Sequence, residues 1–270
     1  MSGVPAFKPS VESTTSKVID WAAWIEAMNR KRQSGIKYNK DGSVDKRHSN
    51  KVAGVSSEVY PFTSQEEIKA MIDVFDARIE NAPDENKKQI ACRNKMLFLI
   101  GINLGIRASD LCSLQYSFFM NNDGSFKDGY SLKPKKTKKA GKFVKLYFNQ
   151  TVKKAITEYI EKYPIQDMDG YLFKSREGDS YIEAKSLWKI IVGAANEAGI
   201  DYKNIGTHSL RKTFGYHIWH SAEDKEKALV MLMAIFNHSS VATTKKYIGL
   251  MDEEIEDVFN SLNLGLDFLE

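Results

Sequence analysis

Apolar residues recur at helical spacing along most of the chain beyond Tyr60. The stripe from Ile68 to Phe75 predicts one helix, and Ser64 and Glu67 have the spacing of a capping box at its start. The same periodicity predicts further helices at about 88–104, 109–114, 151–162, 183–198, 208–220, 224–236, 240–248 and 252–263. In the segment 183–198 we expect one buried face, formed by Trp188, Ile191, Val192, Ala195 and Ala198.

The pattern changes between Phe118 and Phe148, where short apolar runs such as GYSLK and FVKLYF alternate with turn residues. The turns fall at Asn121–Gly124 and at Ala140–Gly141, and a cluster of lysines surrounds the second one. This pattern predicts a small antiparallel sheet with the lysines in its second hairpin. The expected fold class is therefore mainly α with a small antiparallel β-sheet.

The first 58 residues differ from the rest of the chain. A periodic segment from Val18 to Met28 predicts one helix that ends near Arg32, and the sequence after it is polar and basic. Because one helix cannot bury a core, we expect residues 1–58 to form a short helix with a basic flexible arm. Residues 59–270 are then the main domain, with an acidic amphipathic tail from about residue 252.

The composition, 42% hydrophobic and 27% charged over 270 residues, is ordinary for a globular protein. No apolar run approaches the ~20 residues that span a bilayer, and the N-terminus lacks the apolar core of a secretory signal. Cys92 and Cys112 form no CxxC pair. These features predict a cytoplasmic protein without a membrane partner.

Charge is distributed in blocks. Eight Lys or Arg and two Asp lie between Arg30 and Lys51, seven lysines and no acid between Lys133 and Lys145, and seven acids and no Lys or Arg between Asp252 and Glu270. Basic blocks are typical of phosphate binding, although a charge run can also be only a solvated face. The candidate phosphate contacts are Arg30, Lys31, Arg32, Lys133, Lys135, Lys138 and Lys139.

Four segments carry residues with catalytic potential: GINLGIRASDL, PKKTKKAGKFVKLYF, THSLRKTFG and IFNHSSVATTKKYIG. The third segment places a histidine and an arginine at i, i+3 on one helical face, and the fourth places a histidine nine residues before a tyrosine. In chain order the candidate residues are Arg107, Lys136, His208, Arg211, His238 and Tyr247.

These segments, over about 61–249, resemble the tyrosine recombinase, or phage integrase, family, and are similar to compact integrases of phages and mobile elements. The order Arg, Lys, His-x-x-Arg, His, Tyr is that of the family's catalytic residues. The resemblance implies a tyrosine recombinase catalytic domain acting on double-stranded DNA. It implies that Tyr247 attacks a phosphodiester to form a 3′-phosphotyrosyl bond, which conserves the bond energy for rejoining.

The charges of the arginine and lysine side chains suit the catalytic roles that the resemblance implies. Two guanidiniums, Arg107 and Arg211, can hold the non-bridging oxygens of a phosphate whose charge grows in the transition state, so no metal or other cofactor is required. A lysine can protonate the departing 5′-oxygen, because an ammonium loses its proton more readily than a guanidinium. The resemblance gives this role to Lys136, for which Lys135, Lys138 and Lys139 compete.

The resemblance also gives roles to the remaining residues. His208 assists proton transfer from Tyr247 or holds the phosphate, and His238 donates to a non-bridging oxygen. Asp110 supports Arg107, although Arg107 could instead cap a helix or simply pair with this acid. His217 and His220 have a metal-compatible spacing, but no carboxylate or cysteine pattern joins them, so no metal site is expected.

The sequence departs from the family at three places. Asn237 stands where glycine is usual, and we expect it to adopt the left-handed conformation in its place. Lys212 follows Arg211 where histidine is common, which leaves the main set intact. Residues 1–58 are short for the separate DNA-clamping domain of many recombinases.

Three functions remain open at this stage. The first is a site-specific recombinase of the integrase or resolvase type, which assembles on DNA as a dimer or tetramer through the C-terminal tail. The second is a regulatory or replicative DNA-binding protein on the same fold that does not recombine. The third is a type IB topoisomerase, which shares much of the active-site chemistry.

Overall fold

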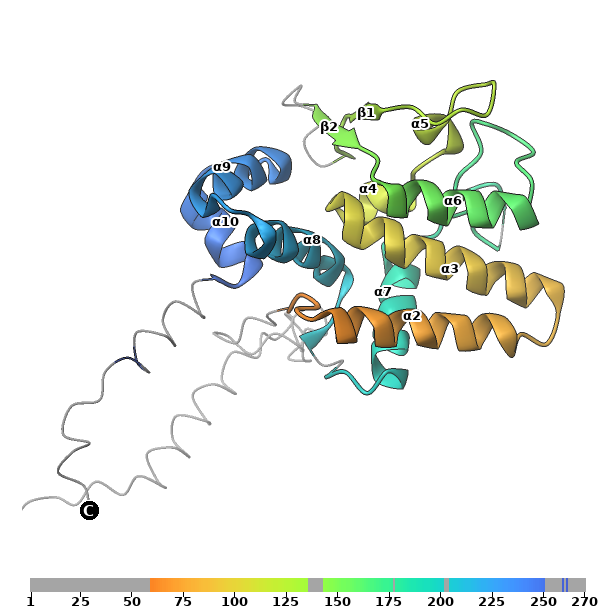
Figure 1. Cartoon of the computed structure of the whole chain (residues 1–270). Coiled ribbons are helices and arrows are strands. Elements are labelled where there is room, and N and C mark those ends of the chain that lie inside the picture. Colours follow the sequence, from red (N-terminus) through yellow and green to blue (C-terminus); the bar gives the residue numbers. More distant parts are fainter. Residues whose placement is uncertain are drawn as a thin grey trace, which may run out of the picture. The chain divides into compact units, whose positions relative to one another are not determined.

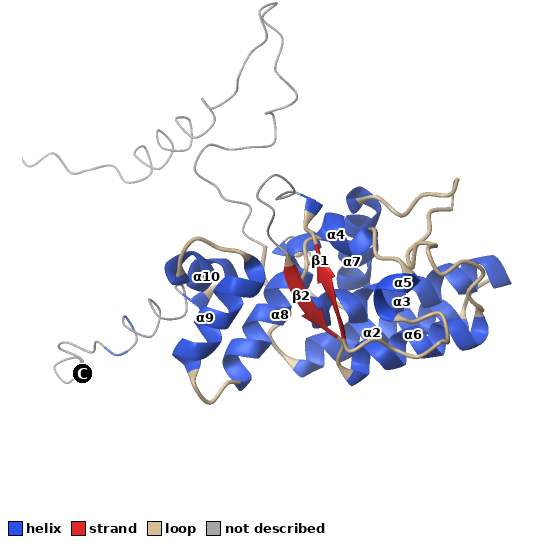
Figure 2. Cartoon of the chain, turned by 90° about the horizontal axis from the view of Figure 1, so that it is seen from above, coloured by secondary structure: helices blue, strands red, loops and turns tan. Residues whose placement is uncertain are grey.

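The computed structural model describes residues 59–135, 143–176, 178–201, 204–250, 259 and 261. The predicted N-terminal helix and most of the tail lie outside these residues, as do Arg30, Lys31, Arg32, Lys136, Lys138 and Lys139. The described elements are mostly helical, with a two-stranded antiparallel sheet, as predicted (Figures 1 and 2). No helix in the described part of the chain is both long and apolar enough to cross a membrane.

The elements follow one another as helices interrupted once by the sheet (Figure 1). They are α2 (Gln65–Glu80), α3 (Glu85–Leu104), α4 (Ala108–Cys112), α5 (Tyr116–Phe119), β1 (Gly129–Leu132), β2 (Val144–Tyr147), α6 (Gln150–Lys162), α7 (Ala184–Glu197), α8 (Thr207–Ser221), α9 (Lys225–Phe236) and α10 (Val241–Ile248).

Local signals explain most helix boundaries. The capping box of Ser64 and Glu67 is present at the start of α2. The α3 helix begins earlier than its apolar stripe predicted, because the Asp84 side chain accepts a hydrogen bond from the backbone N–H of Lys87. It ends at Gly105 in the left-handed conformation.

The sheet is smaller than predicted. Strands β1 and β2 pair antiparallel, with Gly129 opposite Tyr147 and Leu132 opposite Val144. Before β1 the described chain forms α5, and only the isolated bridge between Met120 and Phe126 crosses the first predicted turn. Backbone N–H groups at the start of α5 donate to carbonyls in the loop 168–170, which favours a helical turn here.

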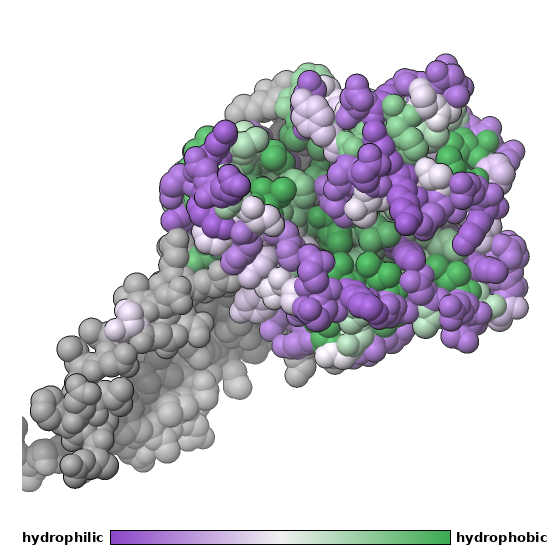
Figure 3. All heavy atoms as spheres, viewed as in Figure 1, coloured by the Kyte–Doolittle hydropathy of each residue, from purple (hydrophilic) through white to green (hydrophobic). Residues whose placement is uncertain are grey.

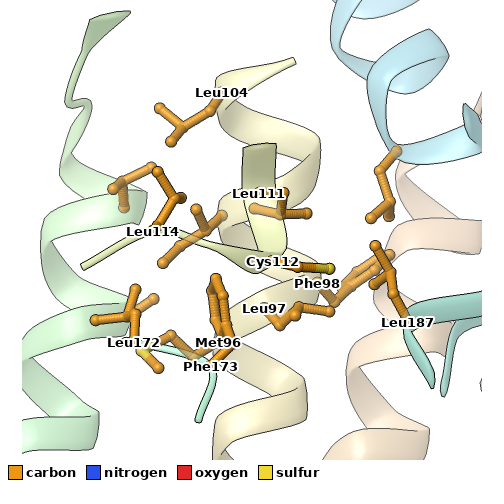
Figure 4. Close-up of a cluster of buried hydrophobic side chains, with 14 of the residues drawn as sticks. Met96, Leu97, Phe98, Leu104, Leu111, Cys112, Leu114, Leu172, Phe173 and Leu187 are labelled. Atoms are coloured by element: carbon orange, nitrogen blue, oxygen red, sulfur yellow. The ribbon is translucent and has the colours of Figure 1, made fainter. Parts of the chain in front are cut away.

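The main core surrounds α3. Figure 4 shows α3 side chains, including Leu97 and Phe98, packed among residues from α4, α7 and the loop before α7. The predicted apolar face of α7 is only partly correct: Trp188 is 48% exposed, and Leu187 and Ala194 are buried instead. The apolar stripe is therefore rotated on the helix relative to the prediction.

A second apolar cluster joins α8, α9 and α10, which lie beside one another at the C-terminal end of α3 (Figure 1). Its buried members are Leu229, Leu232, Phe236, Ile248 and Leu250. Most of the face seen in Figure 3 is hydrophilic, with apolar side chains visible between polar ones. The second cluster fixes α10, which carries Tyr247, against α8, which carries His208 and Arg211.

Candidate active site

A glycine corner places Arg107. Gly105 has φ of 60°, and a Cβ atom there would lie 2.3 Å from the Phe214 ring, so both the backbone and the packing require glycine. The chain then extends through Arg107, whose carbonyl accepts the N–H groups of Asp110 and Leu111 at the start of α4. The backbone of Arg107 therefore caps α4, and its side chain extends from the turn between α3 and α4.

The Arg211 side chain is buried and rigidly held. Its Nη1 donates to the carbonyl of Gly105 at 2.6 Å, and its Nη2 donates to the carbonyl of Phe236 at 2.9 Å. Burial, with the nearby charge of Arg107, lowers the pKa of Arg211 to about 10. The group is still a cation at neutral pH, and its planar fork ties the end of α3 to the end of α9.

His208 and Tyr247 are directly joined. The Nδ1 atom of His208 lies 3.0 Å from the Tyr247 hydroxyl. Burial raises the pKa of Tyr247, an effect opposed by the charges of Arg211 and Arg107. The phenol therefore stays protonated at neutral pH, and His208 is within reach to accept its proton.

His238 follows directly after the end of α9. Asn237 adopts φ 52° and ψ 47°, which confirms the left-handed conformation predicted for it. The Nδ1 atom of His238 lies 3.1 Å from the hydroxyl of Thr244 on α10. Burial, together with Arg211 and Arg107, lowers the pKa of His238 to about 4, so its imidazole is neutral at pH 7.

Asp110 makes a contact that the sequence did not predict. Its buried carboxylate accepts the backbone N–H of Lys135 at 2.9 Å, and no ion pair joins the two described residues Asp110 and Arg107. The Lys135 ammonium donates to the Tyr181 hydroxyl at 2.8 Å and lies 4.1 Å from the centre of its ring. Asp110 thus anchors the residue that immediately precedes Lys136.

Five of the six predicted catalytic side chains meet in one region: Arg107 at the start of α4, two residues on α8, His238 after α9 and Tyr247 on α10. Hydrogen bonds and mutual effects on pKa connect them: Arg107, His208, Arg211, His238 and Tyr247. Lys136 lies outside the described residues. The sequence analysis did not single out Thr244, whose hydroxyl lies next to His238 Nδ1. Its position three residues before Tyr247 on α10 was the available signal. In the described part of the chain, no group of three or more His, Cys, Asp or Glu could hold a metal.

Comparison with known proteins shows the family of the chain. Residues 61–254 match the phage integrase family. The chain belongs to this family. The chain is 36% identical, over 173 residues, to "Probable integrase/recombinase YoeC" of Bacillus subtilis, a match that covers 63% of this chain and 86% of that protein. It is 24% identical, over 203 residues, to "Tyrosine recombinase XerA" of Pyrococcus furiosus, covering 74% of this chain and 61% of XerA.

Solved recombinases have the same fold as this chain. A XerA recombinase crystal structure matches with a TM-score of 0.54 and 19% identity over 91% of this chain and 76% of that chain. XerH bound to its difH substrate matches with a TM-score of 0.55 and 17% identity over 88% of this chain and 64% of that chain. The tyrosine recombinase prediction is confirmed, and with it the fold class and the enzyme class that cleaves and rejoins DNA.

Proposed function

We propose that this protein is a site-specific recombinase that uses Tyr247 to cleave and rejoin double-stranded DNA. The observation that carries the proposal is the 3.0 Å contact between His208 Nδ1 and the Tyr247 hydroxyl, beside the Arg211 cation. A protonated nucleophile, a base within hydrogen-bonding distance and a fixed cation are the groups that phosphoryl transfer without a metal requires.

The Tyr247 oxygen forms a bond to phosphorus as its proton passes to His208, and the bond from phosphorus to the 5′-oxygen breaks. Lys136 supplies a proton to this 5′-oxygen, while Arg107 and Arg211 hold the non-bridging oxygens. Attack of another 5′-hydroxyl on the phosphotyrosine reverses the sequence and completes strand exchange.

DNA binding is proposed at the lysine hairpin and the basic arm. Lys133 and Lys135 lie at the base of the hairpin, and the sequence places Lys138 and Lys139 further along it. Arg30, Lys31 and Arg32 add phosphate contacts from the N-terminal arm. In support, XerH, which shares the fold, was solved bound to its DNA substrate.

Assembly on DNA, as a dimer or a tetramer, is proposed to use the C-terminal tail. The sequence from Ile255 to Leu262 has apolar residues at helical spacing, which requires an apolar surface to cover them. Val230 and Met231 on α9 are 52% and 55% exposed, and they offer such a surface on another copy of the chain.

The experiment that tests the function uses a nicked suicide DNA substrate from the source element. Wild-type protein should form a covalent complex that protease digestion releases, whereas Tyr247→Phe should bind the DNA and form none. Tyr159→Phe, on the distant α6, is the matched control and should react like wild type. Binding without a covalent complex in wild type would instead favour the non-recombining DNA-binding protein, and relaxation of non-specific plasmid would favour a topoisomerase.

A further inference from the structure

Thr244 is a fully buried hydroxyl residue on the helix that carries Tyr247. Its single hydroxyl proton has two neighbouring acceptors: His238 Nδ1 at 3.1 Å and the backbone carbonyl of Ser240 at 3.3 Å. A hydroxyl can donate to only one of them at a time, so the choice decides what His238 Nδ1 can do.

The geometry favours donation to His238. The Ser240 carbonyl already accepts the backbone N–H of Thr244, so it does not depend on the hydroxyl. A distance of 3.3 Å is also long for a bond from one oxygen to another, whose usual range ends near ~3.0 Å. When Thr244 donates to Nδ1, the proton of the neutral His238 ring must reside on Nε2.

The location of this proton matters for the chemistry. His238 is neutral at pH 7 and therefore has a single N–H. With that proton on Nδ1, the Nε2 atom would direct a lone pair at an anionic phosphate oxygen. With the proton on Nε2, the same atom donates a hydrogen bond to that oxygen.

We propose that Thr244 is a positioning residue that holds His238 in the Nε2–H tautomer, so that the helix carrying the nucleophile also prepares the second histidine. When α10 packs against α8 and α9, it brings Tyr247 into the site and sets His238 Nε2 as a hydrogen-bond donor. The catalytic consequence rests on the proposed function, whereas the tautomer is a property of the protein alone.

The tautomer is tested by NMR of the full chain labelled with ¹⁵N-histidine, with His238→Gln used to assign the signals. Wild type should show His238 with its proton on Nε2, and Thr244→Ser should retain this signal. Thr244→Val has the same shape without the hydroxyl, and it should shift the His238 nitrogens towards a mixture of tautomers. A proton on Nδ1 in wild type, or an unchanged spectrum in Thr244→Val, would overturn the proposal.

Cleavage of the nicked substrate tests the consequence. Thr244→Val should cleave up to ~10-fold more slowly, the cost of one hydrogen bond, and Thr244→Ser should lose far less. In a His238→Ala background, Thr244→Val should cause no further loss, because the hydroxyl acts through the imidazole. An equal loss in both backgrounds would show that Thr244 only supports α10. If wild type forms no covalent complex, the proposed function fails, and the NMR result still decides the tautomer.

Discussion

At the scale of single residues, burial sets the protonation states that the chemistry needs. The pKa of Arg211 falls to about 10, which keeps the cation at neutral pH, and the pKa of His238 falls to about 4, which keeps it neutral. The pKa of Tyr247 is raised, so its hydroxyl is protonated at neutral pH. The site therefore holds fixed positive charge from arginine, and under the proposed function proton transfer falls to His208 and a lysine.

The lowered pKa of His238 predicts a dependence of stability on pH. Since the folded value of about 4 lies below the ordinary value of 6.5, the unfolded chain binds more protons between these two pH values. The free energy of unfolding should therefore rise with pH across this window and lose this contribution as pH falls towards 4. Urea denaturation at several pH values should show a shallower rise for His238→Gln than for wild type. Parallel curves for the two proteins would contradict the prediction.

At the scale of elements, Asp110 connects the α4 corner to the hairpin. Because its carboxylate accepts the Lys135 N–H, we expect Asp110 to act on the position of the neighbouring Lys136, the proposed general acid. Asp110→Ala should cleave ordinary DNA slowly, and a 5′-bridging sulfur should restore much of the rate, since a thiolate leaves without a proton. Lys136→Ala should be rescued in the same way.

A matched variant sharpens this measurement. Asp110→Asn retains a side-chain oxygen that can accept the Lys135 N–H, so it should lose less activity than Asp110→Ala. If sulfur rescues Lys136→Ala but not Asp110→Ala, Asp110 acts on the phosphate clamp at Arg107. Rescue of Lys138→Ala or Lys139→Ala, without rescue of Lys136→Ala, would move the acid along the hairpin.

The contact between α8 and α10 gives a second prediction at this scale. A Cβ atom on Gly215 would lie 2.6 Å from Ile248 and 2.9 Å from Phe236, so α10 must shift to admit it. Gly215→Ala should lower the free energy of unfolding by ~1–3 kcal/mol and reduce cleavage, because Tyr247 moves with α10. Gly193→Ala in α7 is the control, since its Cβ would meet only Arg78 at an ordinary 3.5 Å. Unfolding and cleavage assays that do not separate the two variants would contradict this packing argument.

The sequence predicted those features of the fold that depend on residues close together in the chain. The capping box at Ser64, the end of α3 at Gly105 and the left-handed Asn237 depend on neighbouring residues, and all three are present. The α5 turn depends on carbonyls of a distant loop, and the exposure of Trp188 depends on how α7 packs. Neither could be read from local spacing.

The same distinction holds for the candidate site. The order of motifs identified Arg107, His208, Arg211, His238 and Tyr247, because residue type and context carried the family resemblance. It could not show that Asp110 binds the Lys135 N–H or that Thr244 contacts His238, since each contact requires two elements to be placed in space.

At the scale of the whole molecule, charge is divided between the parts of the chain. The lysine hairpin and the N-terminal arm are basic, whereas residues 252–270 contain seven acids and no Lys or Arg. Phosphate repels an acidic segment, so the tail is better suited to a protein surface than to DNA. Its apolar stripe could be covered by its own domain or by a neighbouring subunit, and the proposed assembly depends on the second arrangement.

Removal of residues 252–270 separates these two arrangements. If the tail packs into a neighbouring subunit, the truncated protein should bind a single DNA site as well as the full chain but assemble less cooperatively on paired sites. Strand exchange should then fall more than first-strand cleavage, because cleavage by Tyr247 needs only the residues of one active site. Sedimentation of both proteins on DNA measures the assembly, and thermal unfolding measures the stability of each protein alone. If both proteins assemble equally and the truncated one is only less stable, the tail packs on its own domain. A segment that covers an apolar surface of its own domain stabilises each chain without joining two chains.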